Sequence, residues 1–552
     1  MTCVFWWCVS TQNYNLNPVI HIYSIFPGLE KSFDSYRIPC PHSIGQGVIF
    51  LGKRMPIFYS ALLLTGVNLL LRMVSTSFQV YLSGCIGAAG IGLLQLVLSL
   101  GSMSMTAGMA GIRTATMYLT AEEIGKKRSV SRVLTACGLY SLLCSSTVAL
   151  IVWIFAPALA AGWIGNAETV SALRLYAFFL PVVCLTGVMT GYFTAANRIG
   201  TLAAVEVAEQ LCSMGLTMAI LTLWAKHDPI RACYGVILGS SLGACLTFSC
   251  LLILRLRERE KPGPRLPVTR RLMDAAVPLA LADDLKAGIS TAENLMVPKR
   301  LALYTGTASA LSEFGTVCGM VFPVLMFPAA ILFGLAELLI PEFARCSASG
   351  STRRIRYLVR RSLRIAMLYS LCFCGLLFLL SEELCFSLYR NVEAGQYLRR
   401  FSLLIPMLYC DAITDAMVKG LGQQKICVQY NILTSAMDVV FLYFLLPRYG
   451  MPGYLISFAL THLLNFALSL RQLLKITGES VPFYIPAMAF SVMLASIWAV
   501  SHVNSPLGKC IAFPALLLSS LSLLGIVRKE DFQWIKGLVS KKQQSHNIQI
   551  PT

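Results

Sequence analysis

The sequence predicts an all-α membrane protein that crosses the bilayer about 14 times. Of its 552 residues, 56% are hydrophobic and 13% are charged, whereas soluble domains carry about 25% charged residues. Apolar runs of about 20 residues, the length of a membrane-spanning helix, recur along the chain. A transmembrane barrel would instead show alternating polarity over segments of about ten residues. Helices are therefore the predicted spanning element, because they satisfy their backbone hydrogen bonds internally.

The first good span follows an irregular N-terminal extension, residues 1–54, which contains several prolines. The extension lacks a basic segment followed by a long apolar core, so it does not resemble a signal peptide. We expect either that the natural start is Met55 or that the extension is a disordered cytoplasmic segment. The predicted spans lie at about 57–80, 91–118, 133–157, 172–195, 202–224, 233–254, 273–298, 315–340, 363–388, 401–421, 428–446, 452–474, 483–502 and 510–527.

Lys and Arg concentrate in one set of loops. The chain has 45 Lys and Arg against 26 Asp and Glu, a net charge of +19. The most basic loops are KKRSVSR (126–132), RLREREKPGPRLPVTRR (255–271) and STRRIRYLVRRSLR (351–364), which the predicted spans place on one side. Cytoplasmic loops are enriched in Lys and Arg, so this side and both termini are predicted to be cytoplasmic. Topology explains the net charge, and no nucleic-acid partner is predicted.

A basic segment rich in proline, residues 258–271, divides twelve of the spans into two sixes. The two halves echo each other weakly, because Arg174 precedes a proline by seven positions in the first half and Arg399 does so in the second. Repeated halves around a central site are a common transporter plan. The predicted domains are a first lobe at 55–257, the cytoplasmic linker at 258–271, a second lobe at 272–476, two further spans at 477–530 and a cytoplasmic tail at 531–552.

The stretch LADDLKAGISTAENLMVPKRL (281–301) begins within span seven and has four ionisable groups before Pro298, in an apolar setting, with Lys299 and Arg300 after it. On a helix, Asp283, Lys286, Ser290 and Glu293 follow steps of three and four residues and share one face. Ionisable groups inside a membrane usually line a water-filled cavity or pair with one another. The stripe therefore predicts either a cavity lining or an internal pair, in which Lys286 reaches Asp283 on the same helix.

Other spans carry isolated charges. Arg72 interrupts the first span and Arg113 lies at the end of the second. Each is predicted either to face a cavity or to extend its long side chain to the membrane surface. Asp411 and Asp415 share a face of span ten, where they would repel unless hydrated or paired, so they are candidates for a proton or cation site. Further intramembrane groups are Glu206, Glu209, Asp438 and His462.

Signatures of soluble catalysis are absent from the sequence. There is no GxxxxGK phosphate loop, which argues against ATP hydrolysis. The 19 cysteines are scattered mostly through apolar runs, as expected for packing residues, and no metal-ligand spacing stands out. We therefore expect a protein that is not an enzyme and holds neither a metal nor a cofactor, with coupling to a proton or sodium gradient or to the membrane potential as an open alternative.

Several stretches resemble a known family. They are VYLSGCIGAAGIGLLQLVLSL (80–100), GMAGIRTATMYLTAEE (108–123), GYFTAANRIGTLAAVEVAEQ (191–210), TAENLMVPKRL (291–301), EFGTVCGMVFPVLMFPAAILFGLAELLIPEFAR (313–345) and VKGLGQQK (418–425). In this order they resemble the stage V sporulation protein B branch of the multidrug/oligosaccharidyl-lipid/polysaccharide exporter superfamily, over about residues 55–530.

The resemblance implies two six-helix lobes around a central cavity, two extra C-terminal helices and alternating access. Related flippases move undecaprenyl-pyrophosphate-linked sugars, including the peptidoglycan precursor, across the membrane. Arg72 and Lys286 match basic positions in spans one and seven of such proteins. Arg113 departs from the family, which often has proline in that context. A pyrophosphate needs compensating Lys or Arg in a low-dielectric cavity, which agrees with these residues.

The leading interpretation is a flippase for a lipid-linked oligosaccharide or peptidoglycan precursor, in envelope polysaccharide or spore cortex synthesis. A cation-coupled multidrug exporter is the alternative, favoured by Asp411, Asp415 and Glu206, although the first span contains no acid. A scaffold without transport activity would not need a polar interior. The expected partners are membrane lipids, an anionic lipid-linked sugar and envelope-synthesis proteins, and the expected oligomeric state is a monomer in the plasma membrane.

Overall fold

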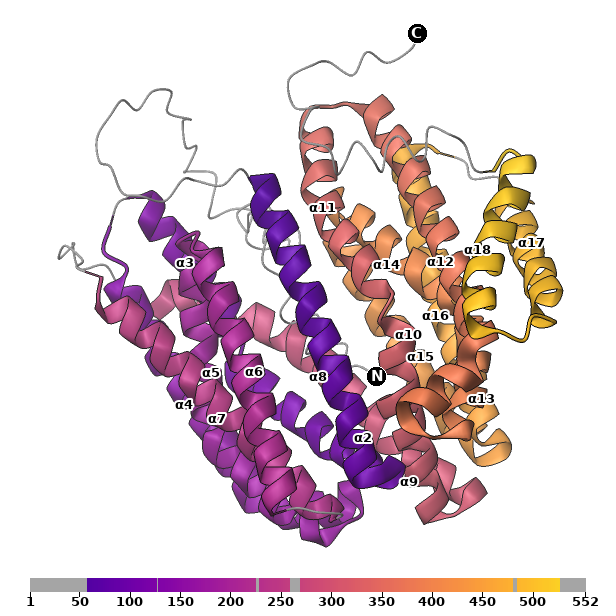
Figure 1. Ribbon diagram of the computed structural model, residues 1–552. Coiled ribbons are helices and arrows are strands. Elements are labelled where there is room, and N and C mark those ends of the chain that lie inside the picture. The colour runs from indigo at the N-terminus through magenta and orange to yellow at the C-terminus, as the bar shows by residue number, and fades with distance from the viewer. Residues whose placement is uncertain (1–56, 127, 225–227, 259–268, 480–483, 527–552) are drawn as a thin grey trace. The chain divides into compact units, whose positions relative to one another are not determined.

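A computed structural model describes residues 57–126, 128–224, 228–258, 269–479 and 484–526, which form helices and short connections with no strand among them (Figure 1). The predicted extension at 1–54, most of the linker at 258–271 and the tail at 531–552 lie outside these ranges. The described elements are α2 (Ile57–Met109), α3 (Ile112–Gly125), α4 (Ser131–Ala158), η3 (Leu159–Ile164), η4 (Ala167–Thr169), α5 (Val170–Ala195), α6 (Ile199–Leu223), α7 (Pro229–Leu256), α8 (Thr269–Thr305), α9 (Thr307–Thr316), η5 (Val317–Val321), α10 (Phe322–Met326), α11 (Ala329–Ala348), α12 (Thr352–Tyr389), α13 (Val392–Ser402), α14 (Ile405–Gly420), α15 (Gln424–Tyr449), α16 (Met451–Thr477), α17 (Tyr484–Ser501) and α18 (Pro506–Leu523).

The prediction of an all-α polytopic membrane fold is confirmed. In the described part of the chain, 11 helices are long and apolar enough to cross a membrane, or up to 12 if the bent pair α13 and α14 is one span. The predicted count of fourteen is not confirmed. One reason is that α2 continues through a kink at Gly87 (φ 69°, ψ 178°), so two predicted spans form one described helix. Another is that α8, which contains the predicted span seven, is not among the apolar set.

The chain forms two compact units, and each is built from two separate segments. Unit 1 comprises Met1–Ile331 and Gln424–Thr461, and unit 2 comprises Leu332–Gln423 and His462–Thr552. α8 and α15 thus belong to the same compact unit as α2 to α7. The division of the transport unit at the 258–271 linker stays a prediction.

Close packing of small side chains holds unit 1 together. α5 packs against α3, α4 and α7, and a buried cluster extends from these helices to the start of α8. Ala115, Cys137 and Ala276 in this cluster have no exposed surface. Lipid tails are as apolar as leucine, so helices in a membrane associate through close contact rather than through burial from water. Small residues at these positions allow that contact.

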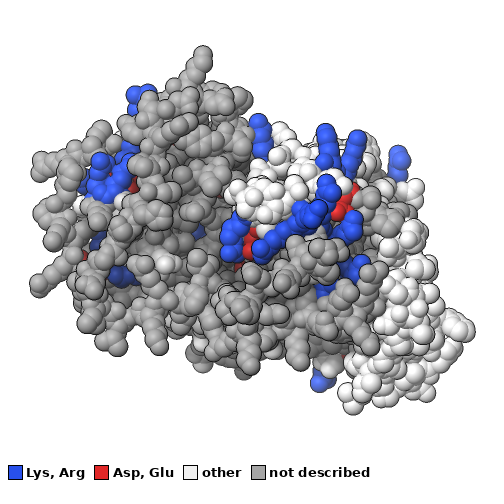
Figure 2. All heavy atoms as spheres, turned by 90° about the horizontal axis from the view of Figure 1, so that it is seen from above, with Lys and Arg blue, Asp and Glu red and all other residues white. Residues whose placement is uncertain are grey.

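α12 is the helix around which unit 2 is packed, and it contacts α13, α14, α17 and α18. Its 38 residues extend about 57 Å, well beyond the hydrocarbon core of about 30 Å. Arg353, Arg354, Arg356 and Arg360 in its first turns are exposed, which places the excess length at the basic end of the helix. Lys and Arg side chains gather on the face seen in Figure 2, with fewer acidic ones beside them.

The arginines of the weak internal echo make similar contacts. In unit 1 the guanidinium of Arg174 lies 5.7 Å from the ring centroid of Trp153 on the preceding helix. In unit 2 the guanidinium of Arg399 lies 4.7 Å from the ring centroid of Phe378, again on the preceding helix. A cation placed over an aromatic ring at this distance is attracted by the ring. Equivalent positions in sequence therefore have equivalent local contacts.

The predicted second span is broken. α2 ends at Met109, Ala110 (φ 42°) and Gly111 (φ 69°) both have left-handed backbone, and α3 begins at Ile112. A side chain at Gly111 would also meet α8, because its Cβ would lie 2.6 Å from the carbonyl oxygen of Ala276. The break therefore depends on a glycine for both its conformation and its contact with α8.

We predict that Gly111→Ala destabilises the protein. A left-handed residue with a side chain costs about 1–3 kcal/mol, and the close contact with α8 adds to this. The apparent melting temperature in detergent should fall by several degrees. Gly138→Ala in α4 is the matched control, because no heavy atom lies within 4 Å of its added Cβ and alanine favours a helix. Equal effects of the two substitutions would contradict the role of the break.

Candidate functional site

The first turn of α3 has the chemistry of an anion site within a span. Gly111 caps the helix without a side-chain hydrogen bond, and the first N–H groups of a helix have no partner in the helix itself. These groups form the positive end of the helix dipole. Interrupted membrane helices use such half-helix ends to face anionic parts of their substrates.

Arg113 adds a full positive charge to this helix end. It lies in the first turn of α3, is half-buried and interacts electrostatically with Glu206 of α6. One turn along α6, Glu209 accepts a hydrogen bond of 2.7 Å from Thr247 of α7. The acids of the predicted span five thus lie against neighbouring helices of unit 1, and one of them balances the arginine.

The other two predicted basic residues lie on helices of the same unit. Arg72, in α2, is buried with 9% of its surface exposed. Lys286, in α8, is exposed and interacts electrostatically with Asp283. α8 packs against both α2 and α3, so the three helices that carry Arg72, Arg113 and Lys286 form one connected group. Their role in binding stays a prediction.

The predicted polar stripe of α8 runs from an exposed end to a buried end. Asp283 and Lys286 are exposed, whereas Ser290 and Glu293 are half-buried. The interaction between Lys286 and Asp283 is the internal pair that sequence reasoning offered as one alternative. At the other end of the stripe, Glu293 interacts electrostatically with Asp438 of α15. The stripe therefore contains two different arrangements, an acid–base pair and an acid–acid pair.

The Glu293–Asp438 pair is a candidate proton or cation site. Asp438 is 5% exposed, and its Oδ1 accepts hydrogen bonds from Ser457 (2.6 Å) and Thr461 (3.2 Å) of α16. An ionised carboxylate can only accept hydrogen bonds. Two ionised carboxylates that interact at close range repel each other, so a single proton on the pair would relieve the repulsion. A small cation that displaces this proton would find oxygen ligands from three helices.

Asp411 and Asp415 lie in unit 2, whereas the residues described above belong to unit 1. Asn465 of α16 donates a hydrogen bond of 2.9 Å to Asp411, and Ser469 donates one of 2.9 Å to Asp415. Lys419 lies 3.9 Å from Asp415. The repulsion expected between the two acids is thus offset by partners on α16 and by one lysine.

Sequence reasoning missed the polar partners of these acids. In α16 they recur at every fourth position and so share one face of the helix. The sequence could have revealed this spacing. Only the tertiary structure shows which acids this face of α16 contacts. The same applies to α8, where Asn294 donates to the hydroxyl of Ser99 in α2 at 3.0 Å. The stripe of α16 consists of Ser457, Thr461, Asn465 and Ser469.

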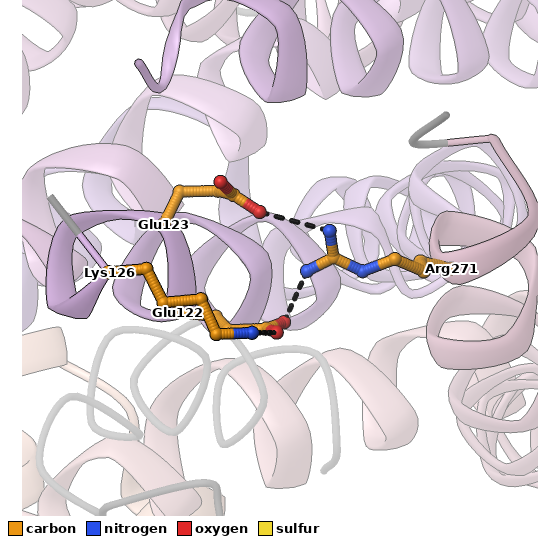
Figure 3. A network of polar contacts seen from close by, with 4 residues as sticks. All are labelled: Glu122, Glu123, Lys126 and Arg271. Atoms are coloured by element: carbon orange, nitrogen blue, oxygen red, sulfur yellow. Dashed lines mark hydrogen bonds and ion pairs between the residues drawn. The ribbon is translucent and has the colours of Figure 1, made fainter. Parts of the chain in front are cut away.

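A second polar network joins the end of α3 to the start of α8 (Figure 3). The guanidinium of Arg271 donates to Glu123 at 2.9 Å and also to Glu122, which in turn lies 2.5 Å from Lys126. Burial alone would lower the pKa of Arg271, but the hydrogen bonds to Glu123 and Glu122 outweigh it and raise that pKa. Arg271 therefore stays charged and connects α8 to α3 through ion pairs.

The helix before the linker is held in unit 1 as well. Glu258 accepts a hydrogen bond of 2.5 Å from the hydroxyl of Tyr192 and is paired with Arg198. Arg255 lies over the ring of Tyr192, 4.9 Å from its centroid. Both described ends of the linker region are thus fixed by ionic contacts to helices of the first half. Among the described residues, no group of three or more His, Cys, Asp or Glu is placed to hold a metal ion.

The fold is similar to those of solved membrane transporters. With the lipid II flippase MurJ in an inward closed conformation, the structure shares the fold at a TM-score of 0.64 and 12% sequence identity, covering 86% of this chain and 100% of the other. With the inward-facing conformation of a multidrug resistance MATE family transporter of the MOP superfamily, the TM-score is 0.57 at 14% identity, covering 79% of this chain and 96% of the other.

The sequence comparisons give more particular relatives. Residues 58–283 match the family described as Polysaccharide biosynthesis protein. Over 473 residues the chain is 20% identical to Stage V sporulation protein B of Bacillus subtilis (strain 168). The match covers 82% of this chain and 90% of that protein. The predicted resemblance to this branch of the superfamily is confirmed.

We predict that Arg271→Met destabilises the protein more than Lys126→Met does. The first change leaves the carboxylate of Glu123, whose side chain is 6% exposed, without its cation, at a cost of about 1–3 kcal/mol. Lys126 is 44% exposed, and exposed ion pairs contribute about 0.2–1 kcal/mol. Thermal unfolding in detergent measures both.

A second substitution checks the cause. Glu123→Gln added to Arg271→Met removes the uncompensated charge and should recover part of the lost stability. If Arg271→Met were no more destabilising than Lys126→Met, the network would not hold α8 to α3.

Proposed function

We propose that the chain is a flippase for an undecaprenyl-pyrophosphate-linked oligosaccharide or peptidoglycan precursor, working by alternating access. The relatives support this, since one belongs to sporulation and another is a flippase for lipid II. The observation that carries the proposal is the interrupted second span, where the start of α3 and Arg113 combine a helix dipole with a guanidinium inside the membrane.

A pyrophosphate matches this chemistry. It carries about two negative charges, and charge-assisted hydrogen bonds from guanidinium and backbone N–H groups are the strong ones in proteins. Lys286 lies on α8, which packs against α3, and Arg72 lies on α2, which packs against α8. These two residues are therefore the proposed further contacts. Lys286 would exchange Asp283 for the headgroup, and the exposed Asp283 carboxylate would then be hydrated or protonated.

The Glu293–Asp438 pair is the proposed coupling site. Its single proton can be released to one side and regained from the other, or displaced by sodium, while the hydroxyls of Ser457 and Thr461 hold the acid in place. Proton relays built from carboxyl groups are common in membrane transporters. Movement of the proton down its gradient would then drive the return of the empty carrier.

A cation-coupled multidrug exporter is the second candidate. The buried acids of both units favour it, because such exporters bind cations. The three basic residues argue for the flippase, because a cationic drug would be repelled by them. The family match to polysaccharide biosynthesis also weighs toward the flippase.

The proposed location is the plasma membrane, with both termini in the cytoplasm. The exposed arginines at the start of α12 and the Arg271 network would then lie on the cytoplasmic side, as the concentration of Lys and Arg in cytoplasmic loops predicts. Envelope-synthesis proteins are the proposed protein partners, the working unit is a monomer, and the chain is proposed to transport rather than to catalyse.

We predict that Arg113→Gln and Lys286→Gln each lower leaflet exchange of an undecaprenyl-pyrophosphate sugar at least tenfold in reconstituted vesicles, since one charge-assisted hydrogen bond contributes about 1.5–3 kcal/mol. Arg72→Gln should behave in the same way. Arg231→Gln is the control, because this arginine is 57% exposed and pairs with Asp228 on the surface. Exchange at the wild-type rate in all three variants, with folding intact, would overturn the basic site.

A separate experiment addresses coupling. Asp438→Asn should abolish the response of exchange to an imposed proton or sodium gradient, because Glu293 would lose the second carboxyl group with which it is proposed to share the proton or bind the cation. Glu209→Gln, an acid of α6 outside the pair, should keep the response. A gradient response that survives Asp438→Asn would place coupling elsewhere.

A further inference from the structure

Two polar rungs join α14 to α16 within unit 2. The first is the hydrogen bond from Asn465 Nδ2 to Asp411 Oδ2, and the second is that from Ser469 Oγ to Asp415 Oδ1. Both pairs are spaced by four residues, so the rungs are one turn apart on each helix. Asn465 is 4% exposed and Ser469 is fully buried. The rungs therefore lie in the packed interior of the unit.

The first rung has two polar atoms left over. Asp411 Oδ1 and Asn465 Oδ1 are both buried and have no hydrogen-bond partner within the described part of the chain. Both atoms are acceptors when the acid is ionised, so the rung lacks a donor. Leaving a buried acceptor unsatisfied costs about 1–3 kcal/mol, and here two of them belong to the same pair of side chains.

A single proton on Asp411 would give both of these oxygen atoms a hydrogen-bond partner. A protonated carboxyl group has one O–H donor, and the remaining acceptor of the pair is the amide oxygen of Asn465. A carboxylic acid and an amide can join through two hydrogen bonds, N–H to carbonyl and O–H to carbonyl, and the first of these is already present. We propose that Asp411 is a proton-binding site whose proton closes an acid–amide pair with Asn465 and thereby holds α14 to α16.

The charges around the rung agree with this. Asp415 and Lys419 act electrostatically on Asp411, and Lys419 lies 3.9 Å from Asp415. One lysine balances one aspartate, so a proton on Asp411 leaves the cluster neutral, whereas its ionisation places two like charges at i and i+4. The other titratable or charged side chains on the helices around α14 include Glu337 of α11, Arg361, Arg364 and Tyr369 of α12, and His462 and Arg471 of α16.

The consequence is a contact between two helices that depends on protonation. Loss of the proton turns the O–H donor into an acceptor that faces the amide oxygen of Asn465, so one of the two bonds becomes a repulsion. The rung of Asp415 and Ser469 has no such dependence, because its hydroxyl donor stays. This site is separate from the Glu293–Asp438 pair of unit 1, and it does not rest on the proposed substrate.

Infrared spectroscopy of the full-length protein in lipid nanodiscs at neutral pH tests the proposal. The spectrum of Asp411→Asn subtracted from that of the wild type should contain a protonated-carboxyl C=O band that shifts in D₂O. Asp415→Asn is the matched control one turn away, and its difference spectrum should contain carboxylate bands instead. A carboxylate signal in the Asp411→Asn difference would overturn the proposal, because Asp411 would then be ionised.

Three further measurements test whether the band reports a proton shared between Asp411 and Asn465. Asparagine at position 411 can form both hydrogen bonds of the pair, so Asp411→Asn should fold and melt like the wild type, whereas Asp411→Ala should melt at a lower temperature. Asn465→Leu should keep the carboxyl band but move it to the position of a free acid. Sodium added at constant pH should leave the band unchanged; its disappearance would mean that a metal cation rather than a proton occupies the site.

Discussion

Compensation of charge inside the bilayer is the constraint on which this structure depends. An ionised side chain in hydrocarbon is costly, so such groups face a cavity or one another. Here several acids and bases of the spans are found with partners of opposite charge: Arg113 with Glu206 of a neighbouring helix, and Lys286 with Asp283 of the same helix. The interaction of Arg113 with Glu206 favours one rotation of α3 and α6 about their axes, because only one face of each helix carries the charge.

The same contacts would give the proposed transporter its chemistry. A pair that is satisfied at rest could exchange one partner for a substrate if water or a proton then compensates the group that is released. Close packing around the pairs is supplied by small residues such as Ala115 and Ala276, since lipid offers no hydrophobic drive for helix association. The Arg271 network adds ion pairs to this packing where the linker region joins unit 1 (Figure 3).

Local features of this fold could be predicted from the sequence, and tertiary ones could not. The apolar runs located the spans, and the three- and four-residue spacing put Asp283, Lys286 and Glu293 on one face of α8. The partner of Glu293 could not be predicted, because Asp438 is more than a hundred residues away. The break at Gly111 was also missed, since α2 and α3 read as one apolar run and only the contact with α8 makes the glycine necessary.

Unit 1 is proposed to recognise the negative charge of a lipid-linked pyrophosphate. Native mass spectrometry of the protein with undecaprenyl diphosphate, undecaprenyl phosphate and uncharged undecaprenol tests it most directly, because the three lipids differ only in the headgroup. The account predicts tightest binding of the diphosphate, weaker binding of the monophosphate and weakest binding of the alcohol. Equal binding of all three would mean that the lipid chain alone is recognised, and would contradict the account.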